Sequence, residues 1–370
     1  MDLAHDPLWA RCQQLGAELS VLGTDEHQLP IWSATRPGDS AQPPILITSG
    51  SHADETSGPE AAVRLLANLP TERTVIVIPH RDPLGARGIP AALLACGGDD
   101  ASGLHTWNDV RQWLAERHLL LAEDGSFAIG LAGDLAIAGM EPTGDSFGTE
   151  KIIKSLMFWL ETHPNHRAAL EGRWIVVPAN APGCDRRGIL ECGYSIRLTR
   201  DNFVGHYNRF FGHPEAPRGV AVVQAFIDDV QPGLTIDLHE GWNTRSYWFV
   251  SDEASAFASR SEQLEQHVCD ALDAAGLPMS TLSELVPNMP AEHLLRFTPK
   301  SHGRLVWRWP PHQESPWGVA LMPYAAQYGP AFQTEVGRWN SWEDRLAYQR
   351  VLAESLVLAD RHLARRSPSS

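Results

Sequence analysis

The sequence has few cysteines, no long apolar run and no excess of basic residues. No run of apolar residues reaches the length of a membrane-spanning helix, so we expect no membrane partner. With 30 basic against 45 acidic side chains and a net charge of −15, nucleic acid is not an expected partner either. The cysteines are odd in number and scattered, which favours reduced thiols in a cytoplasm over a disulfide framework. The five are Cys12, Cys96, Cys184, Cys192 and Cys269.

The chain's length and its first residues set further expectations. The opening Met1–Asp6 lacks the basic and apolar regions of a secretory signal, so we expect a cytoplasmic protein. A chain of 370 residues is long enough to bury a sizeable core in one large or two small domains. Its oligomeric state is left open by the sequence.

Two metal-binding side chains follow the first strongly apolar run. His52 and Glu55 come after Ile45–Ile47, and Ser57-Gly58-Pro59 then begins a predicted helix. This order places the imidazole and the carboxylate in the loop at the end of a strand, where α/β proteins carry their chemistry. With 16 histidines in the chain, one His-x-x-Glu pair could also arise by chance.

A third candidate ligand closes another apolar run much later in the chain. His239 ends the segment Leu234–His239, which also resembles a strand. Two histidines and a glutamate are a ligand set that suits catalytic Zn²⁺, with one position left for water. We therefore predict one Zn²⁺ per chain, although the ligand types also permit Mn²⁺ or Co²⁺. Asp237 is predicted to be structural, and Glu240 to point away from His239.

The order of the predicted elements resembles the start of the zinc carboxypeptidase family. The metal loop, Gly50–Gly58, is similar in wording to the aspartoacylase and succinylglutamate desuccinylase branch of that family. The resemblance implies an α/β fold, a single-domain three-layer α/β/α structure with a central mixed sheet over residues 1–370. The expected elements are strands over 17–23, 29–34, 44–49 and 74–78 and a helix over 59–68.

The segment between the predicted strand over 74–78 and the later motifs is longer than this family usually needs, so we predict an insertion at about 88–172. Within it, Trp107–Leu121 has the pattern of an amphipathic helix and Lys151–Glu161 of a second helix. Trp174–Pro178 is predicted to be a strand.

The resemblance also implies roles for residues in the second half of the chain. Asn208 and Arg209 match the family's Asn-Arg pair, in which the arginine binds the carboxylate of the substrate, a task that suits its planar fork. The family's aspartate two residues earlier is replaced by His206. A second arginine is expected to polarise the scissile carbonyl, and Arg200 is favoured for it over Arg197. Tyr324 is the candidate for a phenol that binds substrate.

Glu335, in Thr334-Glu335-Val336-Gly337, corresponds to the family's general base, which takes a proton from the attacking water and passes it to the leaving nitrogen. The predicted helix over 343–365 follows, and the remaining chain has no room for the β-rich C-terminal domain of the deacylase branch. The sequence therefore favours a metallocarboxypeptidase that releases C-terminal amino acids from small peptides. The alternative is a deacylase acting on N-acyl amino acids; an esterase and a non-catalytic relative also stay open.

Overall fold

The computed structural model of the chain describes most of its residues. The described residues are 3, 6–95, 101, 103–125, 127–141, 148–179, 190–200, 204–241, 246–250, 256–277, 279–280, 297–300, 304–308 and 318–366. Among them, no helix is both long enough and apolar enough to cross a membrane.

A ten-stranded mixed sheet forms the main body, with strand order β1-β2-β4-β3-β11-β16-β13-β15-β14 and β12 paired to β16. Its middle strands β4, β3, β11 and β16 are parallel to one another, and antiparallel strands flank them. The strands are β1 (Glu18–Thr24), β2 (Pro30–Arg36), β3 (Ile45–Ser49), β4 (Val75–Ile78), β11 (Leu234–Leu238), β12 (Glu240–Gly241), β13 (Tyr247–Val250), β14 (Phe297–Lys300), β15 (Arg304–Arg308) and β16 (Ala331–Gly337).

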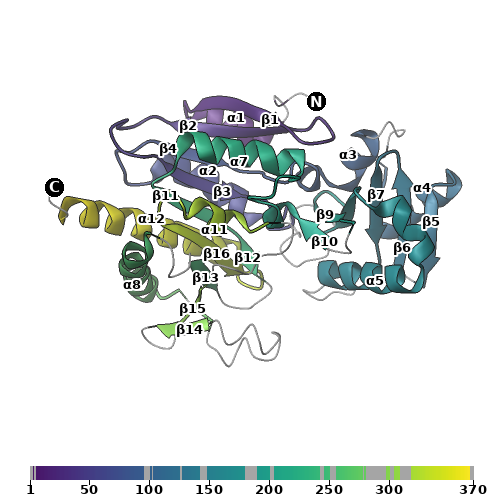
Figure 1. Cartoon of the computed structure of the whole chain (residues 1–370). Coiled ribbons are helices and arrows are strands. Elements are labelled where there is room, and N and C mark those ends of the chain that lie inside the picture. Colours follow the sequence, from purple (N-terminus) through teal and green to yellow (C-terminus); the bar gives the residue numbers. More distant parts are fainter. Residues whose placement is uncertain are drawn as a thin grey trace.

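Helices cover both faces of this sheet (Figure 1) because its central strands are apolar on both sides. Alternate residues of β3 show this: Ile45 and Ile47 belong to one core cluster, whereas Leu46 belongs to another. The first face packs against α1 (Pro7–Gln14), α2 (Ser57–Asn68), α8 (Ala258–Ala274) and α12 (Trp342–Arg366), and the second against α7 (Arg218–Val230) and α11 (Leu321–Ala325). The predicted α/β/α architecture with a central mixed sheet is confirmed.

A second sheet, with strand order β10-β9-β8-β7-β6-β5, was not predicted. Its strands are β5 (Leu120–Asp124), β6 (Phe127–Ala132), β7 (Leu135–Gly139), β8 (Trp174–Pro178), β9 (Gly193–Leu198) and β10 (Val204–His206), and its helices are α3 (Gly88–Ala95), α4 (Trp107–Glu116), α5 (Gly148–Thr162) and α6 (Arg167–Leu170). The predicted helix over 107–121 is too long, since α4 ends at Glu116 and β5 begins at Leu120. The insertion over about 88–172 stays a prediction.

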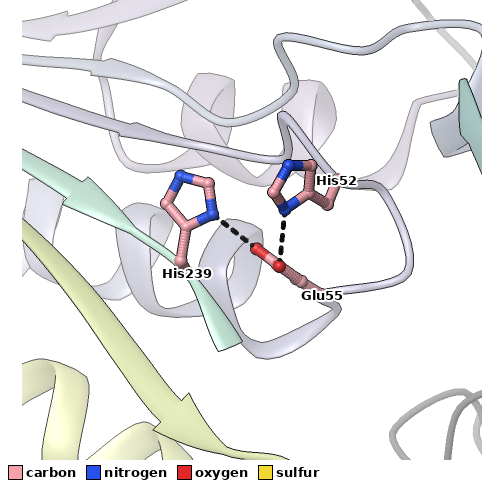
Figure 2. A group of neighbouring side chains, drawn as sticks. All are labelled: His52, Glu55 and His239. Atoms are coloured by element: carbon pink, nitrogen blue, oxygen red, sulfur yellow. Dashed lines mark hydrogen bonds and ion pairs between the residues drawn. The ribbon is translucent and has the colours of Figure 1, made fainter. Parts of the chain in front are cut away.

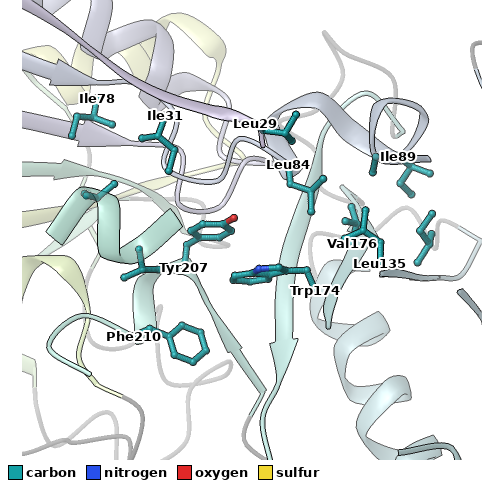
Figure 3. Close-up of a cluster of buried hydrophobic side chains, with 14 of the residues drawn as sticks. Leu29, Ile31, Ile78, Leu84, Ile89, Leu135, Trp174, Val176, Tyr207 and Phe210 are labelled. Atoms are coloured by element: carbon teal, nitrogen blue, oxygen red, sulfur yellow. The ribbon is translucent and has the colours of Figure 1, made fainter. Parts of the chain in front are cut away.

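One hydrophobic core joins the two sheets. Tyr207 and Trp174 stack at 4.5 Å between ring centroids, with their planes 10° apart. Figure 3 shows them between side chains of the main body, such as Ile31, and side chains of the second sheet, such as Val176. A shared core of this kind holds the second sheet in a fixed position beside the carboxyl ends of the parallel strands.

Candidate metal centre

The predicted metal ligands meet at the carboxyl ends of adjacent parallel strands. His52 and Glu55 lie in the loop after β3, and His239 directly follows β11. Leu238 at the end of β11 is paired with Ser49 at the end of β3, so both loops leave the sheet at the same level. Parallel strands whose order is set by buried apolar side chains thus bring together residues that are 187 positions apart.

The three side chains face one another closely (Figure 2). His52 Nδ1 lies 2.7 Å from Glu55 Oε1, and His239 Nδ1 lies 2.9 Å from Glu55 Oε2. One ligand atom from each residue falls within 4.8 Å of the others. His239 is fully buried and Glu55 nearly so, whereas His52 keeps 15% of its side chain exposed. This is the only such group of potential metal ligands among the residues that the structure describes.

Hydrogen bonds behind His239 leave its Nδ1 atom available to a metal. Nε2–H of His239 donates to Oδ2 of Asp237 at 2.9 Å, which directs the Nδ1 lone pair toward Glu55. The Nδ1 atom and Glu55 Oε2 are both buried, and neither makes a hydrogen bond despite the short distance between them. Two buried polar atoms without hydrogen-bond partners, aimed at one point, fit a shared cation there. Nitrogen and carboxylate donors are the types that Zn²⁺ prefers.

Asp237 is itself held by a buried arginine. Both of its carboxylate oxygens accept from Nη2 of Arg81 at 2.7 Å, and Oδ1 also accepts from Thr48 Oγ1 at 2.8 Å. Nη1 of Arg81 donates to Oδ1 of Asn208 at 3.3 Å, and Asn208 also accepts from the backbone N–H of Leu321 at 2.8 Å. These contacts support the predicted structural role of Asp237, and the network fixes the orientation of His239.

The electrostatics of the cluster follow from burial and from these contacts. Burial raises the pKa of Glu55, but the facing imidazoles of His52 and His239 outweigh it, so its pKa is well below the ordinary value. Burial lowers the pKa of His239, yet Asp237 and Glu55 together raise it to about 10. Without a metal the ring therefore carries a second proton at neutral pH, and a metal bound at Nδ1 would replace that proton. Glu55 is therefore an anion at neutral pH, which is the form that binds a metal.

Glu335 lies beside the cluster in the neighbouring strand. Asp237 pairs with Gln333 and Glu240 with Val336, so Glu335 stands at the level of His239. Its Oε1 accepts from Gln333 Nε2 at 2.8 Å. Burial raises the pKa of Glu335 to about 7, although His239 opposes the shift. A carboxylate with a pKa near neutrality is suited to accepting and returning a proton.

Arg209 lies close enough to Glu335 for the two charged side chains to interact. Its Nη1 donates to the backbone oxygen of Asn208 at 2.7 Å. Burial lowers the pKa of the Arg209 guanidinium, and the nearby side chains of Tyr194 and Glu335 act against that shift. The structure therefore places Asn208, Arg209 and Glu335 near the candidate metal ligands, and their roles stay predictions.

Two predicted site residues lie elsewhere. The side chain of Arg200 is 81% exposed, and its Nε atom is 3.9 Å from Glu171 Oε1. Arg200 lies two residues after the end of β9. Tyr324 donates its hydroxyl to Asp228 Oδ1 at 2.6 Å on the α7 side of the sheet. Neither residue contacts the cluster, so the predictions of Arg200 as the carbonyl-polarising group and of Tyr324 as a substrate ligand lose their basis.

Other residues at the site were not predicted. Arg338 donates to Asp54 Oδ2 at 2.8 Å and to Glu55 Oε1 at 3.4 Å. Tyr194, from β9 of the second sheet, stacks on His52 at 4.8 Å between ring centroids. Of these residues, only Arg81 could have been found from the sequence. It follows the apolar strand β4, and the carboxyl ends of parallel strands meet at one edge of a sheet. Glu240 accepts from Arg345 at 3.2 Å, away from the cluster, as expected.

No family model matches the chain, and no curated protein does. Among solved structures, a metallo-carboxypeptidase from Burkholderia cenocepacia aligns with 97% of this chain and 69% of its own, at 11% identity and a TM-score of 0.49. Carboxypeptidase A from Helicoverpa armigera aligns with 98% of this chain and 72% of its own, at 11% identity and a TM-score of 0.47. Similarity at this level does not assign a function.

Proposed function

We propose that the protein is a metal-dependent hydrolase that cleaves an amide bond next to a free carboxylate, and specifically a zinc metallocarboxypeptidase. The observation that supports this most strongly is the buried cluster of His52, Glu55 and His239, whose ligand atoms converge beside a glutamate with a raised pKa. Two of these atoms, Nδ1 of His239 and Oε2 of Glu55, are buried without a hydrogen-bond partner. A metal site and a proton acceptor at one strand edge are the minimum set for metal-assisted hydrolysis.

Each residue has a role that its position supports. His52, Glu55 and His239 would hold Zn²⁺, which when bound lowers the pKa of water and polarises a carbonyl. Glu335 would accept a proton from the attacking water and return it to the leaving nitrogen, a step that its pKa of about 7 favours. Arg209 would bind the substrate's carboxylate through its planar guanidinium.

Burial of the cluster supports a small or terminal substrate group. The side chain of Glu55 is 4% exposed and that of His239 is fully buried, while His52 provides the exposed edge. The end of an extended chain reaches such a site more easily than the middle of a folded protein. This favours cleavage at a chain terminus.

The test is an activity assay of the zinc-loaded chain against matched short peptides and N-acyl amino acids, followed by mass spectrometry. We expect loss of C-terminal residues from the peptides. Glu335→Gln should lower the rate by a factor of about 10²–10⁴ and leave zinc stoichiometry unchanged. Cleavage of the N-acyl amino acids alone would identify a deacylase instead, and cleavage of neither would refute hydrolysis of amides next to a carboxylate.

A matched pair of arginine variants tests the substrate carboxylate. Arg209→Met should raise KM for substrates with a free carboxylate and leave their amidated counterparts unaffected, because only the former use the guanidinium. Arg200→Met is the control, since its exposed side chain lies away from the cluster. Equal effects of the two variants would contradict the role of Arg209.

A further inference from the structure

His206 lies behind His52 on the side away from Glu55. Its Nδ1 atom is 2.9 Å from Nε2 of His52, and the two rings meet edge to face at 4.5 Å between centroids. His206 ends β10 of the second sheet. The second sheet thus supplies the group that contacts the far nitrogen of a metal ligand, at the position where the family's motif has an aspartate.

The hydrogen bonds of His206 define its protonation. Its Nδ1 atom also accepts from the backbone N–H of Asn208, at 3.3 Å, so this nitrogen carries a lone pair and the ring is neutral with its proton on Nε2. Nε2 of His52 must then be the donor in the contact between the two rings. This leaves Nδ1 of His52 as the atom that faces Glu55, which is the orientation that a metal requires.

The two candidate histidine ligands therefore differ in the hydrogen-bond acceptor that lies behind each ring. Behind His239 stands the carboxylate of Asp237, which brings a full negative charge and a charge-assisted hydrogen bond. Behind His52 stands a neutral ring that accepts the same kind of hydrogen bond without charge. A neutral acceptor raises the basicity of its partner less than a carboxylate does.

We propose that His206 is a positioning residue that fixes His52 in its metal-binding orientation and, by being neutral, holds the metal less tightly than an acidic residue at that position would. The proposal rests on the proposed function in one respect, since it requires the cluster to bind a metal. It makes the second sheet part of the metal centre.

The side chain permits a well-matched set of variants. Oδ1 of aspartate or asparagine is attached to Cγ, as Nδ1 of histidine is, so each variant places an acceptor at nearly the same point. His206→Asn keeps a neutral acceptor, His206→Asp adds a charge, and His206→Phe keeps a ring and removes the acceptor. The experiment measures the Kd for Zn²⁺ of the full chain by competition with a chelating dye at one fixed pH.

We expect His206→Asn to bind Zn²⁺ within about threefold of the unaltered chain, His206→Asp about tenfold more tightly and His206→Phe about 10–100-fold more weakly. Circular dichroism of each metal-free variant checks that it folds, and the asparagine and aspartate variants carry the test if the phenylalanine variant does not. An aspartate variant that binds no more tightly than the unaltered chain overturns the inference. An unaltered chain that binds no Zn²⁺ overturns the proposed function instead.

Discussion

The buried pair of Arg81 and Asp237 gives the sharpest test of how this site is held together. Both side chains are almost fully buried, 1% and 0% exposed, and they meet at 2.7 Å. Asp237→Leu removes the only carboxylate that the structure places on this guanidinium, among the residues it describes. Because an uncompensated buried charge remains, we expect the free energy of unfolding to fall by about 3–5 kcal/mol.

The double variant separates the charge pair from its surroundings. Arg81→Met combined with Asp237→Leu removes both charges and keeps apolar volume, so it should cost less than the sum of the two single changes. Thr48 and His239 also lose a partner, and for this reason the double variant stays below the stability of the unaltered chain. We expect a coupling energy of about 2–3 kcal/mol.

The assay is urea unfolding of the metal-free chain, followed by circular dichroism, with Zn²⁺ affinity measured in parallel. The exposed pair of Arg111 and Glu123 is the control: its atoms are also 2.7 Å apart, but the side chains are 34% and 44% exposed. Its coupling should be below about 1 kcal/mol. Equal coupling in the two pairs would refute the argument from burial. Zinc affinity should fall about 10–100-fold in Asp237→Leu, because His239 loses its orienting acceptor.

Three further predictions concern stability. Burial raises the pKa of Asp82 to about 7 from an unfolded value near 3.8, so between these pH values the folded state binds a proton that the unfolded state does not. The free energy of unfolding, relative to that of Asp82→Asn, should therefore fall as pH rises from about 4 to about 7. A difference between the two proteins that does not change with pH in urea unfolding would contradict this. Gly88→Ala should cost at least about 2 kcal/mol, since φ is +72° and the new Cβ would meet the carbonyl oxygen of Leu190, whereas Gly125→Ala, in open space, should cost about 1 kcal/mol. Zn²⁺ at about 100 times its Kd should add about 2.7 kcal/mol to the free energy of unfolding, and a chelator that changes nothing would count against the metal site.

The four strands and the helix α2 of the first 80 residues could be predicted because their signals are local, whereas α1 was not predicted. The structure has strands at Glu18–Thr24 and Ile45–Ser49 and a helix at Ser57–Asn68, close to the predicted ranges. In each case, apolar periodicity ends at a glycine, proline or polar turn. The same holds for the last helix, Trp342–Arg366.

The second sheet could not be predicted from these signals. Its strands Phe127–Ala132 and Leu135–Gly139 are short runs rich in alanine and glycine, which have neither strict alternation nor strong β propensity. Such runs are compatible with a buried helix or a buried strand, and only their pairing with each other decides between the two. The amphipathic pattern that predicts a helix over 107–121 also extends into Leu120 and Leu121, although β5 begins there.

For the site, the sequence was enough to predict which side chains take part and that they follow strands, because His52, Glu55, His239 and Glu335 each stand at or after an apolar run. The polar groups that surround them could not be predicted, because they depend on how the chain packs in three dimensions. Arg200 is close to Asn208 in the chain, but it follows the outer end of β9 and lies away from the cluster. Arg81 is distant in the chain and buried within it, because the register of parallel strands, set by the whole core, fixes which loops meet.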